Sequence, residues 1–318
     1  DFRLIQPPWE VTRQLVDKDL TYAAAGKVGV DTARSYGPAE CENIRNLDVT
    51  YPVLVKPLEG HLFSARFGTK LFLARNSREL SRAVERVESA RIRCGLYDYI
   101  PGPDNLLFDC QLYMTRSGQP TGVFFKRKLR LSPPRFGVGR AAETVEASEL
   151  TEPSVELLRY MGWRGIASVS YKLDPRDGRF RLIEVNGRCP LGHGLARRAG
   201  INHPLLAFSE AVSGEAAGDE PNGWEGVWIH LHADLLYSAW CGRREGLNRS
   251  EFWRSYRGPK TYAVWSPRDP KPFLTQWAHT LRKAGRMLTR GDERKEVAGR
   301  VQWPAELGMV ARAGNPAR

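Results

Sequence analysis

The stretch GIASVSYKLDPRDGRFRLIEVNGR, residues 165–188, decides the fold of this chain. Its first part, GIASVSYKL, is rich in small and β-branched residues that favour a strand. DPRDG is a turn signal, because proline fixes φ and Asp-Gly tolerates positive φ. RFRLIEVNGR then runs back as a second strand, so we predict a β-hairpin over these residues.

One face of the second strand carries polar side chains of a particular kind. Because side chains alternate between the faces of a strand, Glu184, Asn186 and Arg188 share one face, and Ile183 and Val185 share the other. Carboxylate and amide oxygens are hard ligands suited to Mg²⁺, and a guanidinium group suits a phosphate. The same alternation is found in any half-exposed hairpin, so the trio by itself leaves a purely structural role open.

The composition is typical of a globular protein. The chain has 318 residues, of which 42% are hydrophobic and 26% charged, enough for a buried core and about two domains. There is no apolar run of the roughly 20 residues that span a bilayer, and no signal peptide is visible. Because the chain starts at Asp1 rather than Met, we expect a fragment or a processed form. Its five scattered cysteines form no CxxC and indicate reduced thiols in a cytoplasmic protein.

The chain is basic, with a formal net charge of +12. Residues 281–318 hold nine Lys/Arg and four Asp/Glu, so this tail supplies +5 of that charge. Such an excess is compatible with binding to nucleic acid or an anionic surface. Without an RNP, zinc-finger or helix-turn-helix signature, we favour pockets for anionic small molecules together with a solvated tail, disordered over residues 290–318.

The remaining chain alternates helical and extended patterns. Residues 59–70 read as a mobile, glycine-containing loop between two strands, with Lys56 and Lys70 placed to hold phosphates or simply solvated. Residues 126–143 read as a basic, irregular segment that is either an anion-binding or an exposed loop. The other expected elements are helices over 8–28 (broken at Lys18), 76–90, 152–162, 190–200 and 204–214, a loop over 31–50, a hairpin turn at 117–118 and a linker at 218–223.

His230, His232 and Asp234 have the H-x-H-x-D spacing of some metal sites. On a strand, both histidines would share one face. A third histidine does not follow closely, so we favour packing or hydrogen bonding over metal binding here.

Several stretches, taken in this order, resemble the ATP-grasp superfamily and most closely its carboxylate–amine ligase-like branch. The resemblance covers most of residues 10–213. It is carried by DKDLTYAAAGKVGV, YPVLVKP, GHLFSARFGTK, YIPGPD, FFKRKLRLSPPRFGVG and DPRDGRFRLIEVNGRCPLGHGLARRAGINHP.

The resemblance implies an α+β fold in which two lobes clamp Mg–ATP, followed by an α/β C-terminal extension. It divides the chain into an N-terminal helical segment and linker (1–50), the grasp lobes (51–217), the extension (218–289) and the basic tail (290–318). The N-terminal domain that precedes the lobes in such proteins is expected to be missing.

The resemblance also implies roles for individual residues. Lys18 and Lys56 would contact the ATP phosphates, and the 59–70 loop would close over them with His61 and Lys70. Further implied contacts are Asp98 in the hinge that holds adenine and ribose, Glu184 and Asn186 on Mg²⁺, Arg188 on the transferred phosphoryl group or acyl phosphate, and Arg127 and Lys128 on the same anions or the substrate carboxylate.

One position departs from the family pattern. The first strand of the hairpin usually carries Glu or Gln toward the metal, whereas the predicted register places Ser170 there, with Ser168 on the same face. A hydroxyl is a poorer Mg²⁺ ligand than a carboxylate. One metal is then lost, or is held by Ser170 through water.

The resemblance implies an ATP-dependent ligase that activates a carboxylate as an acyl phosphate and joins it to an amine, with ATP and Mg²⁺ as cofactors and small molecules as substrates. No nucleic-acid partner and no membrane span are expected. Two alternatives stay open: a degenerate ATP-binding module without turnover, suggested by Ser170, and a basic nucleic-acid or anionic-surface binder, suggested by the charge.

Overall fold

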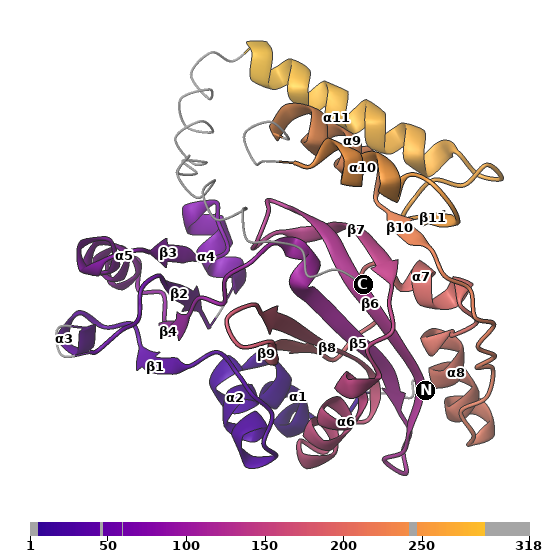
Figure 1. Ribbon diagram of the computed structural model, residues 1–318, viewed down its shortest axis with the longest axis horizontal. Coiled ribbons are helices and arrows are strands. Elements are labelled where there is room, and N and C mark those ends of the chain that lie inside the picture. Colours follow the sequence, from indigo (N-terminus) through magenta and orange to yellow (C-terminus); the bar gives the residue numbers. More distant parts are fainter. Residues whose placement is uncertain (1–5, 45–46, 59, 242–246, 290–318) are drawn as a thin grey trace. The chain divides into compact units, whose positions relative to one another are not determined.

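The structure, a computed structural model, describes residues 6–44, 47–58, 60–241 and 247–289 (Figure 1). The chain divides into two compact units, Asp1–Ile229 with Gly258–Ala263, and His230–Arg257 with Val264–Arg318. The architecture is mixed α+β, as the sequence predicts, and the first unit contains both β-sheets.

Two short helices open the described chain, α1 (Trp9–Val16) and α2 (Lys18–Lys27). Asp17 separates them, and its carboxylate accepts the backbone N–H groups of Asp19 and Leu20 as the N-cap of α2. The predicted break at Lys18 is therefore confirmed, and this lysine becomes the first residue of α2.

The smaller sheet has four strands in the order β1-β4-β2-β3, with bounds Ser35–Pro38 (β1), Val53–Pro57 (β2), Phe72–Ala74 (β3) and Cys94–Asp98 (β4). Helix α5 (Ser77–Ser89) packs on one face through Leu80, Val84 and Val87, and Asn76 is its N-cap. Strand β1 and the short helix α3 (Cys41–Ile44) lie inside residues 31–50, so the expectation of a continuous loop there was wrong.

Residues 59–70 are also not a loop, because helix α4 (Gly60–Phe67) occupies most of them. The fully buried ring of Phe63 lies 4.8 Å from that of Phe67 and 4.9 Å from that of Phe72, and this packing stabilises the helix. The two glycines mark its ends, since Gly68 follows the last turn with a φ of 67°.

The larger sheet has seven strands in the order β11-β10-β7-β6-β5-β8-β9. The predicted hairpin is confirmed as β8 (Gly165–Asp174) and β9 (Arg179–Asn186), and its register pairs Ser168 with Asn186 and Ser170 with Glu184. The other strands are β5 (Leu107–Met114), β6 (Pro120–Ser132), β7 (Val138–Thr144), β10 (Val227–Ile229) and β11 (Lys260–Tyr262). Most of the basic segment 126–143 is thus paired strand, which corrects the irregular loop expected there.

The two faces of this sheet differ in chemistry. One face is apolar and packs against α1, α2 and α6 (Thr151–Tyr160), with Leu112, Val169 and Leu157 fully buried between them (Figure 1). The other face is polar in its central strands. Helices α7 (His193–Arg198) and α8 (His203–Ser213) cover one end of it through an apolar cluster and a 2.6 Å hydrogen bond from Tyr113 to Glu210.

The second unit contains α9 (Leu231–Cys241), α10 (Arg249–Ser255) and α11 (Lys271–Thr289). His232 lies within α9 rather than on a strand, and its ring packs 4.8 Å from that of Trp277. Asp234 is fully buried and accepts a 2.8 Å hydrogen bond from Tyr256. Among the described residues no metal-binding group of His, Cys, Asp and Glu forms, and no helix has the length and apolarity to cross a membrane. The tail at 290–318 lies outside the described residues.

Candidate functional site

The polar face of the seven-stranded sheet brings polar and charged residues from four strands into one row. Glu184 on β9 lies opposite Ser170 on β8, Ser170 opposite Asp109 on β5, and Asp109 opposite Lys126 on β6. Neighbouring strands lie about 4.8 Å apart, so each side chain in the row reaches the next. The adjacent row holds Asn186, Ser168, Gln111 and Phe124.

Asp109 is the anchor of this row and is only 3% exposed. Its Oδ1 accepts a 2.6 Å hydrogen bond from Ser170 and lies 3.1 Å from Nζ of Lys128, while its Oδ2 lies 3.3 Å from Nζ of Lys126. Burial alone would raise the pKa of Asp109, but the two lysines and the hydroxyl outweigh it and lower the pKa to about 2. The carboxylate is therefore ionised and fully engaged.

The two lysines that pair with Asp109 have different surroundings. Lys126 is buried, donates a 2.9 Å hydrogen bond to the Leu191 carbonyl, and has a pKa lowered by that burial. Lys128 is more exposed, at 20% of its side chain against 5% for Lys126. Burial would also lower the pKa of Lys128, but the carboxylates of Asp109 and Glu184 raise it. Lys128 is thus a firmly charged group whose side chain is partly exposed.

Lysines from the N-terminal part of the chain also interact with the carboxylate of Glu184. Lys56 on β2 is buried with its Nζ 5.3 Å from the Tyr97 ring centroid. Burial and the charge of Lys18 lower the pKa of Lys56 to about 8, and the charge of Glu184 opposes them. Burial likewise lowers the pKa of Lys70, again with Glu184 acting in the opposite direction. Lys56, Lys70 and Lys128 thus each interact electrostatically with Glu184, and Lys18 interacts with Lys56.

Glu184 and Asn186 stand side by side at the end of β9. The amide Nδ2 of Asn186 donates a 3.0 Å hydrogen bond to Oε1 of Glu184, and Glu184 is exposed. An exposed carboxylate beside an amide whose oxygen can turn toward the same point fits a divalent cation with oxygen ligands. Arg188 follows the end of β9, is exposed, and donates a 3.4 Å hydrogen bond to the Cys189 carbonyl.

Ser170 does not present its hydroxyl hydrogen to solvent. It is 2% exposed and donates to Asp109. Its side chain is on the predicted face, opposite Glu184, but it serves first to orient Asp109. The sequence interpretation of Ser170 as a metal ligand therefore stays a hypothesis, and the structure gives this residue a different, visible contact.

Two predicted site residues, Arg127 and Asp98, are not brought into this group. Arg127 projects from the opposite face of β6, where its Nε donates a 2.8 Å hydrogen bond to Glu143. The side chain of His61 lies outside the part of the chain that the structure describes. Asp98 pairs with Val53 at the end of β4, on the face opposite that of Tyr97 and Lys56.

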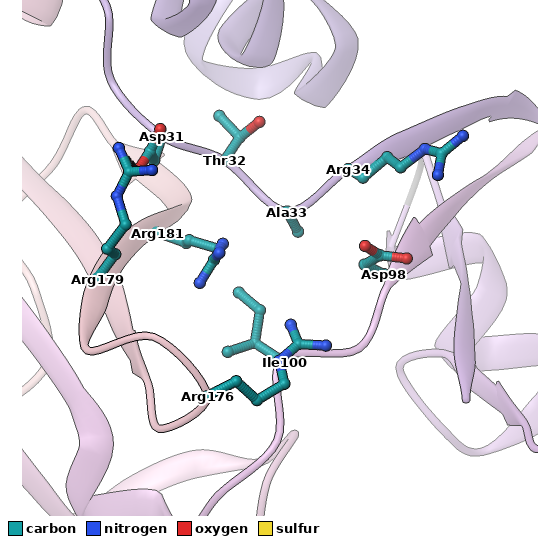
Figure 2. Close-up of a pocket in the computed structure, with 9 residues that line it drawn as sticks. All are labelled: Asp31, Thr32, Ala33, Arg34, Asp98, Ile100, Arg176, Arg179 and Arg181. Carbon is teal, nitrogen blue, oxygen red and sulfur yellow. Dashed lines mark ion pairs between the residues drawn. The ribbon is translucent and has the colours of Figure 1, made fainter. Parts of the chain in front are cut away.

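Asp98 instead lines a separate cavity of about 260 Å³, next to the turn between β8 and β9 (Figure 2). Arg176 and Arg181 extend toward it, and both are held by Asp174, which is fully buried and lies 2.6 and 2.7 Å from them. The complete lining is Asp31, Thr32, Ala33, Arg34, Asp98, Ile100, Arg176, Arg179 and Arg181.

Sequence reasoning missed three residues of the polar face: Asp109, Lys126 and Lys172. Lys172 shares the face of Ser170, donates a 3.1 Å hydrogen bond to the Gly102 carbonyl and has a pKa lowered by burial to about 8. The signal for Asp109 is in LLFDCQLYM, where Asp109 and Gln111 are the polar residues at alternate positions of an apolar strand. Such a pattern marks a buried polar face.

Known proteins resemble this chain in sequence and in fold. The family described as "Carbamoyl-phosphate synthase L chain, ATP binding domain" matches residues 141–208, a stretch that contains β8 and β9. The N-terminal section of the carbamoyl phosphate synthase large chain of Methanopyrus kandleri is 25% identical over 209 residues, which are 62% of this chain and 35% of that protein.

Solved structures share the fold at low sequence identity. The biotin carboxylase domain of Hydrogenobacter thermophilus 2-oxoglutarate carboxylase, a complex with MgADP, ADP and bicarbonate, superposes with a TM-score of 0.57 and 19% identity over 70% of this chain and 51% of that one. The L-amino acid ligase of Bacillus licheniformis gives a TM-score of 0.53 and 20% identity over 68% and 55%. The chain thus spans about a third to a half of the length of these relatives. These similarities show that the chain has an ATP-grasp fold and that residues 141–208 are similar to the ATP-binding domain of the carbamoyl-phosphate synthase large chain.

Proposed function

We propose that this protein binds Mg–ATP on the polar face of the seven-stranded sheet and uses it to join a carboxylate to an amine. The observation that supports this most directly is that Lys56, Lys70 and Lys128 all interact electrostatically with Glu184, and that Lys18 interacts with Lys56. Ammonium groups near one exposed carboxylate suit a polyphosphate that arrives with a divalent cation.

The chemistry starts from a poor electrophile, because resonance stabilises a carboxylate against attack by an amine. A carboxylate oxygen attacks the γ-phosphorus, the bond from that phosphorus to the bridging oxygen breaks, and ADP leaves with the electron pair. The amine nitrogen then attacks the acyl carbon, phosphate leaves, and the nitrogen loses a proton. In such phosphoryl transfer the protein contributes mainly charge neutralisation and alignment.

Each side chain has a part in this scheme. Lys18 on α2, Lys56 on β2 and Lys70 shortly before β3 bind the phosphates, and Lys128 binds them from the larger sheet. Glu184 and Asn186 hold Mg²⁺, which when bound neutralises phosphate charge as a Lewis acid. Arg188 remains the candidate for the transferred phosphoryl group, supported by its exposure just beyond these ligands.

Helix α4 takes the place of the predicted lid loop. It spans Gly60–Phe67, between β2, which carries Lys56, and Lys70. We infer that α4 moves as a unit over bound phosphates and excludes water that would hydrolyse an acyl phosphate. The helix is fixed to its sheet by Phe63, so its closure would involve the whole smaller sheet rather than a flexible segment.

The test is ADP release from Mg–ATP across panels of small carboxylic acids, with hydroxylamine as a general amine that traps acyl phosphates as hydroxamates. Acid-dependent ADP release with hydroxamate formation would support the ligase. Saturable ATP binding without ADP release under any acid would support a binding module instead. Salt-sensitive retention of DNA or RNA without ATP binding would support a basic nucleic-acid binder.

A further inference from the structure

The polar face around Glu184 carries several lysines but few side chains that could bind a metal ion. In the part of the chain that the structure describes, no three His, Cys, Asp or Glu side chains form a group that could hold a metal ion. The second strand of the hairpin offers one carboxylate, Glu184, and one amide, Asn186, in contact with each other at 3.0 Å. One carboxylate and one amide suit a single divalent cation that completes its shell with phosphate oxygens and water.

Asp109 is the carboxylate next along the row from Ser170, and its oxygens are already taken. Ser170 donates to Oδ1, Lys128 lies 3.1 Å from Oδ1, and Lys126 lies 3.3 Å from Oδ2. With the residue 3% exposed, a cation entering here would have to displace an ammonium group inside the protein. Asp109 therefore acts as a counter-ion that fixes the two lysines, and it is poorly suited to bind a metal.

Of these two lysines, Lys128 is the one available to a ligand. Lys126 has 5% of its side chain exposed and donates to the Leu191 carbonyl, so its ammonium group is used within the fold. Lys128 has 20% exposed and interacts electrostatically with Glu184 and Lys70, the groups proposed to meet the phosphates. Its position is fixed at one end by Asp109, which in turn is oriented by Ser170.

We propose that Lys128, held in place by Asp109 and Ser170, supplies a permanent positive charge to the ATP phosphates, so that this site works with one divalent cation rather than two. The inference rests on the proposed function and deepens it by naming the cation stoichiometry and the side chain that sets it. A second divalent cation beside a fixed ammonium group would be repelled, and it would find no free carboxylate among Asp109 and its partners. Ser170 acts here as a positioning residue.

The experiment counts Mn²⁺ ions bound to the purified chain with a non-hydrolysable ATP analogue, by electron paramagnetic resonance of free and bound Mn²⁺. The expected result is one Mn²⁺ for each bound nucleotide at saturation. Two Mn²⁺ per nucleotide in the wild-type chain would overturn the inference. This count does not depend on turnover, and so it does not require the substrates to be known.

Variants at Lys128 test whether this side chain sets the number of Mn²⁺ ions for each bound nucleotide. Lys128→Gln should leave phosphate charge uncompensated, admit a second Mn²⁺, and raise the Mn²⁺ concentration for half-maximal nucleotide binding by about tenfold or more. Lys128→Arg keeps the charge and should keep the count at one. Lys27→Gln, an exposed lysine in the last turn of α2, is the matched control for loss of one positive charge.

The outcomes separate this inference from the proposed function. If the wild-type chain binds no nucleotide with or without Mn²⁺, the proposed function fails. If it binds nucleotide with two Mn²⁺, or if Lys128→Gln leaves both count and affinity unchanged, only the inference fails. Should Lys128→Gln unfold, Lys128→Met, which keeps an unbranched side chain without the charge, should admit the same second Mn²⁺, and the wild-type count still decides the inference.

Discussion

Two buried aspartates of the larger sheet each hold two basic side chains, yet they do so in different ways. Asp109, in the middle of β5, holds Lys126 and Lys128 from the neighbouring strand. Asp174, the last residue of β8, holds Arg176 and Arg181 from the adjoining turn and strand. The first pair of cations is distant in sequence from its aspartate, and the second is local.

The choice of cation explains the difference. An arginine presents a planar fork that is always charged, so Asp174 and its arginines make a rigid brace for the β8–β9 turn. A lysine presents a point charge whose pKa shifts with its surroundings, and the pKa of Lys126 is lowered while that of Lys128 is raised. The comparison teaches that the same ion-pair chemistry can brace a turn and, under the proposed function, can position a charge for a ligand on the polar face.

The largest expected effect is at Glu184, the carboxylate on which the lysines converge. Glu184→Gln should lower ADP release by at least about 100-fold, because the cation loses its one charged ligand. Glu143→Gln is the matched control, since Glu143 belongs to β7 and pairs with Arg127 away from the polar face. Steady-state ADP release at saturating Mg²⁺ measures both. Equal losses in the two variants would contradict the assignment of the site to this face.

The next effect compares the two aspartates directly. Asp109→Asn should lower ADP release about 10- to 100-fold, since Lys128 loses the group that positions it, whereas Asp174→Asn should change it by less than about threefold. Both should lose stability, Asp109→Asn by about 3–5 kcal/mol because its partners are buried, and Asp174→Asn by less because half of the Arg176 side chain is exposed. Denaturant unfolding and ADP release together separate these effects. A larger activity loss in Asp174→Asn would reverse the comparison.

Much of the fold was open to prediction because it is local. The β8–β9 hairpin and its register follow from the turn signal and the alternation of residues 165–188, and the break before Lys18 follows from the capping residue Asp17. Helix α4 could not be predicted in the same way, since the contact of Phe63 with Phe72 depends on how β3 packs. Glycines at the ends of a short helix resemble those of a loop.

The site was predictable where it lies on one strand and obscure where it crosses several. Period-two alternation is enough to place Glu184 and Asn186 together. Asp109 becomes part of the site only because β5 pairs with β8, a contact between strands far apart in sequence. Arg127 and Lys128 are adjacent in the chain, so grouping them ignored the alternation that sends them to opposite faces of β6.

A smaller effect is expected from pH on nucleotide affinity. It comes from buried lysines, because arginines stay charged over the same range. The pKa of Lys56 is about 8, mainly because of burial, so this lysine loses its charge as pH rises from 7 to 9. Nucleotide affinity should fall by up to about tenfold over that range, and less in Lys56→Gln, whose affinity is already low at pH 7. Lys172, with a pKa also about 8, accounts for any slope that remains. Isothermal titration calorimetry at each pH measures the affinity.

The same lysine should affect stability with the opposite sign. The pKa of Lys56 in the folded chain, about 8, lies below its ordinary value of 10.5, so between these values the unfolded chain binds more protons. Stability should therefore rise with pH across that window relative to Lys56→Gln. A relative stability that falls between pH 8 and pH 10 would contradict the lowered pKa of Lys56.

The smallest expected effect is at Arg127, which lies between Lys126 and Lys128 in the chain. Its Nε donates to Glu143 at 2.8 Å, and 38% of its side chain is exposed. A partly exposed pair contributes about 1 kcal/mol or less, so Arg127→Gln should lower stability only slightly and change ADP release by no more than about twofold. Lys128→Gln, one residue further along β6, should lower ADP release at least tenfold, because it removes a charge from the phosphates. Each of the two substitutions removes one positive charge, but from opposite faces of β6. A difference in ADP release between them therefore reports the face of the strand. If they lowered ADP release equally, β6 would not alternate as described, and the division of this sheet into a structural face and a ligand-binding face would be wrong.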